Sequence, residues 1–132
     1  MAINEAALQT LIDKEAIREL AMLYSRAIDR KDSTLLRDLY TEDATDTHGT
    51  DFDGNVADFV TFIESTAPFM TYSGHHICNH LISVDGDTAQ GEVYTLAVHC
   101  FAADPANRVE EWHVVRYVDN YRSCADCTWR FS

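Results

Sequence analysis

The sequence has few basic residues. Ten Lys and Arg residues stand against 22 Asp and Glu residues, and the formal net charge is -12 at pH 7. A surface with this charge repels phosphate backbones and anionic membranes, which argues against nucleic-acid binding and against electrostatic binding to a membrane. The acids between Asp38 and Asp58 lack the alternating ligands and terminal Glu of an EF-hand. We therefore expect a solvated acidic rim there rather than a calcium loop.

The chain also lacks the motifs of several large enzyme classes. It has no Gly-rich phosphate loop, no nucleophilic serine elbow and no dinucleotide-binding fingerprint, which argues against kinase, hydrolase and dehydrogenase functions. No cofactor is implied. Residues 1–5 contain no basic region, no apolar run of signal-peptide length follows, and no later segment is long enough to span a bilayer. We expect a cytoplasmic protein.

Four cysteines are present, at Cys78, Cys100, Cys124 and Cys127. A disulfide framework is typical of small secreted chains, so we expect free thiols. Cys124 and Cys127 have the spacing of half a zinc site or of a redox pair. Because the sequence has no second such pair and no strand-to-helix context around this one, a metal or redox site is the weaker alternative.

The apolar periodicity changes once, from helical to extended, without internal repeats or low-complexity segments. Asp13 can cap a helix over residues 13–31 whose apolar residues recur at spacings of three and four. A second, shorter helix is predicted over 32–40. A third begins after Gly54-Asn55 and ends before Pro68.

Beta-branched and aromatic residues dominate the second half of the chain. Asp85-Gly86-Asp87 is a turn of the kind that joins hairpin strands, and residues 102–107 form the next break. The strands predicted for one long antiparallel sheet cover residues 72–84, 88–101, 108–122 and 128–131, joined by a short early strand over 44–48.

Helices followed by a sheet predict an α+β fold of one domain over residues 1–132, which is long enough to bury a single core. The N-terminal helices are expected to pack on one face of a strongly curved antiparallel sheet. This arrangement forms an open cone, in which we expect an apolar pocket between the sheet and the helices.

Two short segments carry the main functional signal, one ending in Asp29 on the first helix and one containing His75 at the start of the first long strand. If the fold brings them together, Asp29 can accept the Nδ1–H of His75 and leave Nε2 free to take a proton from a substrate. Burial is expected to raise the pKa of Asp29. The alternative for Asp29 is a solvated acid at a helix end.

Strand alternation decides which histidine can line the cone. Simple period-two alternation puts His75, Ile77, Asn79 and Leu81 on one face and His76, Cys78, His80 and Ile82 on the other. His76 is the fallback base, because a bulge could exchange neighbouring faces. Structural roles are expected for His76 and His80 otherwise.

These motifs, in this order, resemble the SnoaL-like branch of the nuclear-transport-factor-two-like superfamily. The resemblance covers nearly the whole chain and rests on residues 13–20, Tyr24 with Asp29, and residues 39–44, 75–79, 85–89, 116–119 and 129–131. The branch includes scytalone dehydratase, bile-acid dehydratases and hexachlorocyclohexane dehydrochlorinase, with ketosteroid isomerase a more distant relative. It implies a cystatin-like α+β barrel, open as a cone, and proton chemistry without a cofactor.

The resemblance also assigns roles to residues. It implies that Asp29 and His75 are the catalytic dyad, that Tyr24 is the catalytic tyrosine five positions before the aspartate, and that Asn79 follows the histidine by four. Some relatives continue past the last strand with residues that help to close the pocket, whereas this chain ends at Ser132. We expect this extended C-terminal segment to be lacking.

The remaining candidates lie on the long strands. Tyr94 and His99 are candidate substrate-binding residues together with Asn79; they fall on opposite faces by alternation, so at most one of these two is expected inside. His113 could also reach the pocket. For Tyr24, a hydrogen bond to substrate and a purely structural place in the helix stripe are both open.

Three functional hypotheses remain. The first is a cofactor-independent lyase, most simply a dehydratase, acting on a small hydrophobic cyclic or aromatic substrate by His-Asp base catalysis. The second is a proton-transfer isomerase of the ketosteroid-isomerase type, which needs an oxyanion donor such as Tyr24. The third is a non-catalytic small-molecule-binding or assembly module. The resemblance further implies a homodimer or homotrimer.

Overall fold

The computed structural model describes residues 3–102 and 108–132, so most of the predicted break over 102–107 lies outside the described residues. The elements follow in the order α1 (Glu5–Arg30), α2 (Ser33–Asp38), β1 (Thr45–His48), β2 (Phe52–Asn55), α3 (Val56–Thr66), the 3-10 helix η1 (Ala67–Phe69), β3 (Met70–Asp85), β4 (Thr88–Ala102), β5 (Arg108–Ser123) and β6 (Trp129–Phe131).

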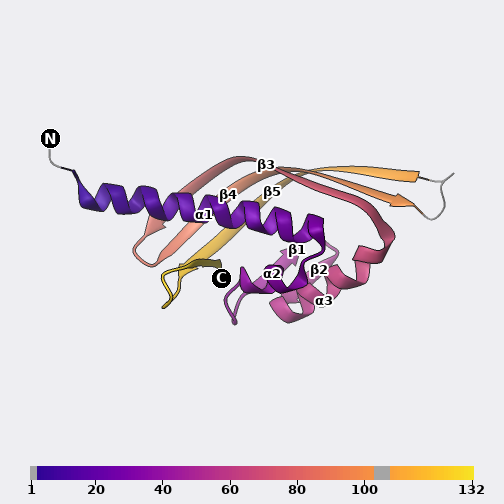
Figure 1. Ribbon diagram of the computed structural model, residues 1–132, viewed down its shortest axis with the longest axis horizontal. Coiled ribbons are helices and arrows are strands. Elements are labelled where there is room, and N and C mark those ends of the chain that lie inside the picture. The colour runs from indigo at the N-terminus through magenta and orange to yellow at the C-terminus, as the bar shows by residue number, and fades with distance from the viewer. Residues whose placement is uncertain (1–2, 103–107) are drawn as a thin grey trace.

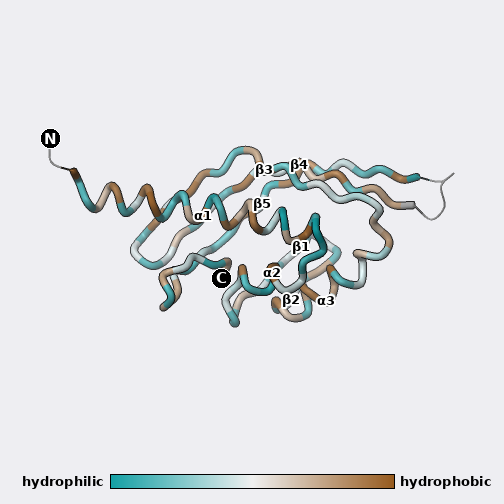
Figure 2. The backbone as a smooth tube through the Cα atoms, in the orientation of Figure 1, coloured by the Kyte–Doolittle hydropathy of each residue, from teal (hydrophilic) through white to brown (hydrophobic). Residues whose placement is uncertain are grey.

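The sheet is antiparallel, in the order β3-β4-β5-β6. It is long and curved, α1 runs along it, and α2, α3, β1 and β2 gather at one end (Figure 1). Hydrophobic and hydrophilic residues alternate along β3, β4 and β5, which is the pattern of a sheet with one covered face (Figure 2). The predicted α+β architecture, with helices packed on an open curved sheet, is confirmed.

The first helix is longer than predicted. It begins at Glu5, because the Asn4 side chain accepts a hydrogen bond from the Ala7 N–H at 3.2 Å and so caps the helix nine residues before the expected cap, Asp13. Asp13 lies inside the helix, where its carboxylate accepts the indole N–H of Trp129 at 3.1 Å. The helix ends where Lys31 adopts a left-handed conformation, with φ 57°.

The second and third helices are confirmed. Asp32 caps α2 by accepting the Leu35 N–H at 3.0 Å, and Asn55 caps α3 by accepting the Asp58 N–H at 3.0 Å. Both caps satisfy backbone groups that the first helical turn leaves without partners.

The short early strand does not join the long sheet as expected. β1 pairs with β2 in a separate two-stranded sheet, in register from Thr45 opposite Asn55 to His48 opposite Phe52. The prediction was wrong because residues 52–55, read only as the approach to α3, supply a nearer partner strand. Tyr40, just before β1, instead forms a bridge to Phe131 in β6.

The face prediction for β3 holds only as far as Ile77. A bulge follows, since Ile77 lies opposite Thr95 whereas His80 lies opposite Val93. The extra residue reverses the alternation, so His80 and Ile82 face inward, and Asn79 and Leu81 face outward. The placement of Asn79 and Leu81 on the inner face with His75, and of His76 and His80 on one face, was therefore wrong.

The core lies between α1, the α2–α3 end and the inner face of the sheet. Its fully buried members include Ile17 on α1, Phe59 on α3 and Tyr121 on β5. Aromatic rings fill the centre, where Phe131 packs against Tyr24, Tyr40 and Tyr121 at centroid separations of 5.1 to 5.9 Å. This packing fixes the last turns of α1 against the sheet, which is where Asp29 lies.

Candidate active site

Asp29 and His75 are brought together, as predicted. Asp29 lies in the last turns of α1 and His75 in β3, and Nδ1 of the imidazole is 2.7 Å from Oδ1 of the carboxylate. The backbone N–H of His75 donates to the other carboxylate oxygen at 3.0 Å. The side chain of His75 is only 4% exposed and that of Asp29 is 20% exposed, so the ring is shielded from water while the carboxylate is partly open to it.

Two serines complete the arrangement. The hydroxyl of Ser73 donates to Asp29 Oδ1 at 3.0 Å, and the hydroxyl of Ser25 donates to the backbone carbonyl of His75 at 2.7 Å. Sequence reasoning missed both, because a serine on a helix or strand carries no signal by itself. Ser25 lies one turn before Asp29 on α1, so one face of the helix holds both the ring and the backbone of His75.

The pKa of Asp29 is lowered from its usual range. Burial acts to raise this pKa, but the hydrogen bonds from the ring and backbone of His75, the charge of that ring and the hydrogen bond from Ser73 outweigh burial. The expectation of a raised pKa was wrong, because it counted burial without the three donors. Asp29 is therefore ionised at neutral pH and accepts the proton on Nδ1, which leaves Nε2 as the nitrogen with a free lone pair.

Tyr24 is buried beside the dyad. Its ring packs edge-on to His75, with centroids 6.4 Å apart, and edge-on to Tyr117 at 6.0 Å. Burial is the main cause that raises the pKa of the Tyr24 phenol, and the charges of Tyr117 and Asp46 add to it. The phenol therefore stays protonated and can donate a hydrogen bond.

His99 lies on the inner face and Tyr94 on the outer one, as alternation required. The rings of His99 and His75 are 5.3 Å apart. Nε2 of His99 is shielded from solvent and has no hydrogen-bond partner among the described residues. Tyr94 is exposed and lies across from the β3 bulge, where Asn79 is exposed too. The expectation that placed Asn79 beside the dyad is thus not supported by its orientation.

A second polar cluster, missed by the sequence analysis, lies in the core near Tyr24. Asp46 accepts the Tyr40 hydroxyl at 2.8 Å and lies 2.9 Å from Nδ1 of His48. Asp46 was read as part of a solvated acidic rim, and for this residue that reading was wrong: the β1–β2 hairpin turns it toward the core. The ring of His48 packs against Tyr117 at 6.2 Å. A histidine two residues from an acid on a short strand was the available signal.

Asp119 on β5 is also inside. Burial raises the pKa of Asp119 to about 6. The hydrogen bond from the Tyr121 hydroxyl, at 3.1 Å, opposes this rise, whereas the charge of Asp46 adds to it. Nε2 of His80 lies 3.2 Å from the same hydroxyl. The Tyr121 hydroxyl therefore lies between Asp119 and His80, which the bulge in β3 turns inward.

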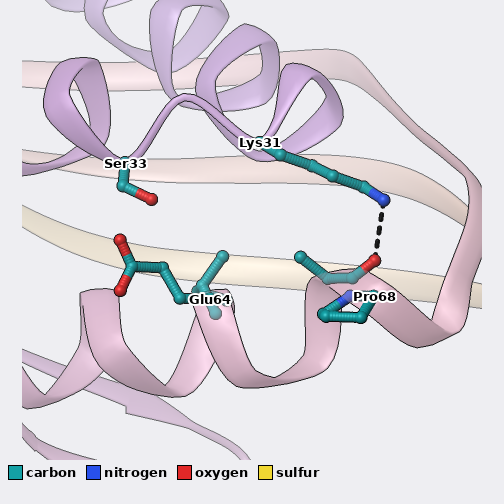
Figure 3. A pocket seen from close by; sticks show the side chains of 6 residues that line it. Lys31, Ser33, Glu64 and Pro68 are labelled. Atoms are coloured by element: carbon teal, nitrogen blue, oxygen red, sulfur yellow. Dashed lines mark hydrogen bonds between the residues drawn. The ribbon is translucent and has the colours of Figure 1, made fainter.

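Asp29 and His75 are among the residues that line a groove of about 420 Å³, together with Arg30, Lys31 and the rest of residues 70–76. Lys31 also borders a smaller cavity of about 240 Å³ on the α2–α3 side. Figure 3 shows Lys31 reaching from the end of α1 to the turn at Pro68, with Ser33 and Glu64 pointing toward each other beside it. Its Nζ donates to the carbonyls of Ala67 at 2.7 Å and Met70 at 3.1 Å, which ties α1 to the start of β3.

Within residues 3–102 and 108–132, no group of three or more His, Cys, Asp or Glu side chains is arranged to hold a metal ion. Cys78, Cys100, Cys124 and Cys127 are free thiols. Across the described part of the chain, no helix combines the length and apolar character needed to cross a membrane.

Comparisons with solved structures show the fold. A protein from Novosphingobium aromaticivorans, described provisionally as a scytalone dehydratase, is 22% identical, with a TM-score of 0.82 over 92% of this chain and 80% of that one. Another protein from the same organism, described as nuclear-transport-factor-two-like with a cystatin-like fold, is 22% identical. Its TM-score is 0.80, over 96% of this chain and 82% of that one. A type 2 hexachlorocyclohexane dehydrochlorinase is 19% identical, with a TM-score of 0.79 over 96% of this chain and 84% of that one.

No match to a curated protein was found. Residues 9–132 match the family described as the SnoaL-like domain. This span holds most of α1 and every later element through β6, including Asp29 and His75. The chain therefore belongs to the SnoaL-like domain family.

Proposed function

We propose that the protein is a cofactor-independent lyase of the dehydratase type. In this proposal Nε2 of His75 removes a proton from carbon, and a hydroxide or another leaving group departs from the neighbouring carbon. The substrate is a small hydrophobic molecule, cyclic or aromatic, because the rings of Tyr24 and His99 flank the base and Phe101 packs against His99 in turn.

One observation carries the proposal, the 2.7 Å contact between the buried imidazole of His75 and the ionised carboxylate of Asp29. The carboxylate fixes the tautomer that presents Nε2 to a substrate, and it stabilises the imidazolium that forms when the proton is taken. The burial of the imidazole strengthens this attraction. Tyr24, kept protonated by burial, supplies a hydrogen bond to the leaving group or to a substrate oxygen.

The test is a screen for elimination from cyclic β-hydroxy ketones and aromatic alcohols. The absorbance of the new double bond measures the reaction. We expect turnover by the wild type, and a loss of roughly 10² to 10⁴-fold in kcat/KM for His75→Gln. The control is Arg37→Gln, because Arg37 is exposed on α2 and does not line the groove at the dyad. If both variants turn over substrate equally, His75 is not the base. Ligand binding without turnover would favour a non-catalytic binding module.

An isomerase is the second candidate, and the protonated phenol of Tyr24 favours it. An isomerase returns the proton to another carbon of the substrate, and the enolate formed between the two steps needs a hydrogen-bond donor. Exchange of substrate protons with deuterium oxide, without loss of a leaving group, would identify this reaction. Loss of a leaving group at the same rate as exchange would identify the lyase.

We also propose that the protein forms a homodimer or homotrimer through the outer face of the sheet. Leu81 on β3 and Trp112, Val114 and Val118 on β5 are exposed there, and Val114 is 86% exposed. Apolar side chains gathered on one face favour contact with another copy of the chain. A cytoplasmic location also belongs to the proposal, since free cysteines fit a reducing compartment.

A further inference from the structure

We propose that His75, His99 and His113 form a row of imidazoles that carries protons between the buried base and solvent. The inference rests on the proposed function in one respect, because it takes His75 as the group that gains a proton during turnover. It adds two residues, His99 and His113, that the reaction itself does not require to touch the substrate.

The row crosses three neighbouring strands on the inner face of the sheet. The ring centroids of His75 on β3 and His99 on β4 are 5.3 Å apart, and those of His99 and His113 on β5 are 5.2 Å apart. The two separations are nearly equal, and the rings are tilted by 56° and 45°. A small rotation of one ring, or a single bridging water, brings nitrogens of adjacent rings within hydrogen-bond reach.

The row has a buried end and an exposed end. The side chain of His75 is 4% exposed, whereas that of His113 is 45% exposed. A carboxylate stands at each end: Asp29 lies 2.7 Å from His75 Nδ1, and Glu111 lies 3.3 Å from His113 Nε2. Negative charge at both ends stabilises an imidazolium that arrives at either one.

His99 is the link, and its environment keeps it neutral. Burial lowers the pKa of His99, and the charges of His75 and His113 lower it further, against smaller opposing effects of Asp29 and Glu111. A neutral imidazole holds one N–H and one free lone pair, which is what a relay needs in order to accept a proton on one nitrogen and release one from the other.

The shielded Nε2 of His99 supports this role. It has no hydrogen-bond partner among the described residues, and an unpaired nitrogen in the interior costs folding free energy. Nor is the row arranged as a chelate, since no three His, Cys, Asp or Glu side chains in the described ranges meet the geometry of a metal site.

The transfer is balanced in protons and charge. Nε2–H of the His75 imidazolium passes its proton to the unprotonated nitrogen of His99, and His99 releases the proton on its other nitrogen to His113. His113 then gives its own second proton to water or Glu111. One positive charge crosses the row; within it only N–H bonds break and form, and the last step breaks an N–H bond of His113 and forms an O–H bond on water or Glu111. His99 and His113 are left as the opposite tautomers, and a ring flip or a proton moving inward restores them.

The test measures how fast His75 gains and loses its proton, and it needs no substrate. The protein is labelled with 13C at histidine Cε1, and relaxation dispersion of the His75 signal is recorded at the midpoint of its own titration. We expect the exchange rate to fall roughly tenfold or more in His113→Gln and in His99→Gln, on the scale of what one positioned proton-transfer group contributes. Arg37→Gln, at an exposed position on α2, is the control.

Equal exchange rates in the wild type and in both folded variants would overturn the proposal, as would a His75 signal that does not titrate. Added free imidazole is expected to restore part of the rate in His113→Gln, because it reaches the exposed end of the row. The outcome is separate from the proposed function: a slow rate in the variants supports the relay even if the substrate screen fails, and equal rates leave base catalysis by His75 intact.

Discussion

Asp29 and His75 are joined twice, once through the imidazole at 2.7 Å and once through the backbone N–H at 3.0 Å. The two bonds go to different oxygens of one carboxylate. The ring N–H and the backbone N–H of His75 are both donors. The side chain at position 29 must therefore offer two acceptor oxygens, and only an ionised carboxylate provides them. The same side chain therefore sets the tautomer of the ring and the position of the strand that carries it.

This double contact predicts the behaviour of Asp29→Asn. An amide has one acceptor oxygen, so either the His75 backbone N–H or its Nδ1 must face an NH₂ group. We expect the ring to adopt the Nε2–H tautomer in part of the molecules, and kcat/KM for the proposed elimination to fall roughly 10² to 10⁴-fold. Nitrogen-15 shifts of the imidazole report the tautomer directly. An unchanged tautomer with unchanged activity would contradict the role of Asp29.

Asp119 predicts a dependence of stability on pH. Burial raises its pKa to about 6, above the ordinary value of about 4, so between these pH values the folded state binds more protons than the unfolded state. The free energy of unfolding therefore falls as pH rises from about 4 to about 6 and stays lower above that range. The loss is at most about 3 kcal/mol, since one pKa unit corresponds to about 1.4 kcal/mol.

Asp119→Asn removes this effect while keeping an acceptor for the Tyr121 hydroxyl. We expect the variant to be more stable than the wild type at pH 8, and to differ little from it at pH 4. Urea denaturation at the two pH values measures the difference. Asp87→Asn is the control, because Asp87 is an exposed turn residue. A gain of the same size at both pH values would show that the effect of Asp119 is not its ionisation.

The helices and the long strands could be predicted from the sequence because local signals determine them, whereas the pairing of Asp29 with His75 was implied by the resemblance to the SnoaL-like branch. Asp32 and Asn55 are helix caps, and a turn separates β3 from β4. The bulge after Ile77 could not be predicted, since it depends on how β3 registers against β4. Asp46 was misread for a similar reason: only the pairing of β1 with β2 turns it toward the core.

The pKa of Asp29 shows a further limit of prediction from sequence. Burial follows from an apolar stripe, but the donors that outweigh it come from Ser73 and from the backbone of His75, more than forty residues away. Hydrogen bonds of this kind depend on tertiary structure. The sequence therefore predicted the partners of the dyad but not the direction of the shift.

The outer face of the sheet predicts the assembly state. Val114 is 86% exposed, so Val114→Glu adds a charge without disturbing the core of one chain. We expect light scattering to give the mass of two or three chains for the wild type and of one chain for Val114→Glu, because a charge buried at an interface is costly. Leu11→Glu, at an exposed apolar position on α1, is the control. A single-chain mass for the wild type would contradict the proposed assembly.

Two strand glycines predict opposite results for the same substitution. A Cβ on Gly91 would lie 2.7 Å from the Tyr121 hydroxyl and 3.0 Å from Nε2 of His80, whereas a Cβ on Gly74 would lie 2.5 Å from the hydroxyl of Tyr72. Tyr121 is 1% exposed and cannot move aside, but Tyr72 is 52% exposed and can rotate into solvent. Contact distance alone would therefore rank the two positions wrongly.

We expect Gly91→Ala to lower the free energy of unfolding by roughly 1 to 3 kcal/mol, the usual cost of overpacking a core. Gly74→Ala should be neutral or slightly stabilising, because alanine reduces the conformational freedom of the unfolded chain. Urea denaturation of both variants at pH 7 makes the comparison. A larger loss of unfolding free energy for Gly74→Ala than for Gly91→Ala would contradict this prediction. Tyr72 would then be held as firmly as Tyr121, and the outer side of β3 would be more rigidly packed than the exposure of Tyr72 indicates.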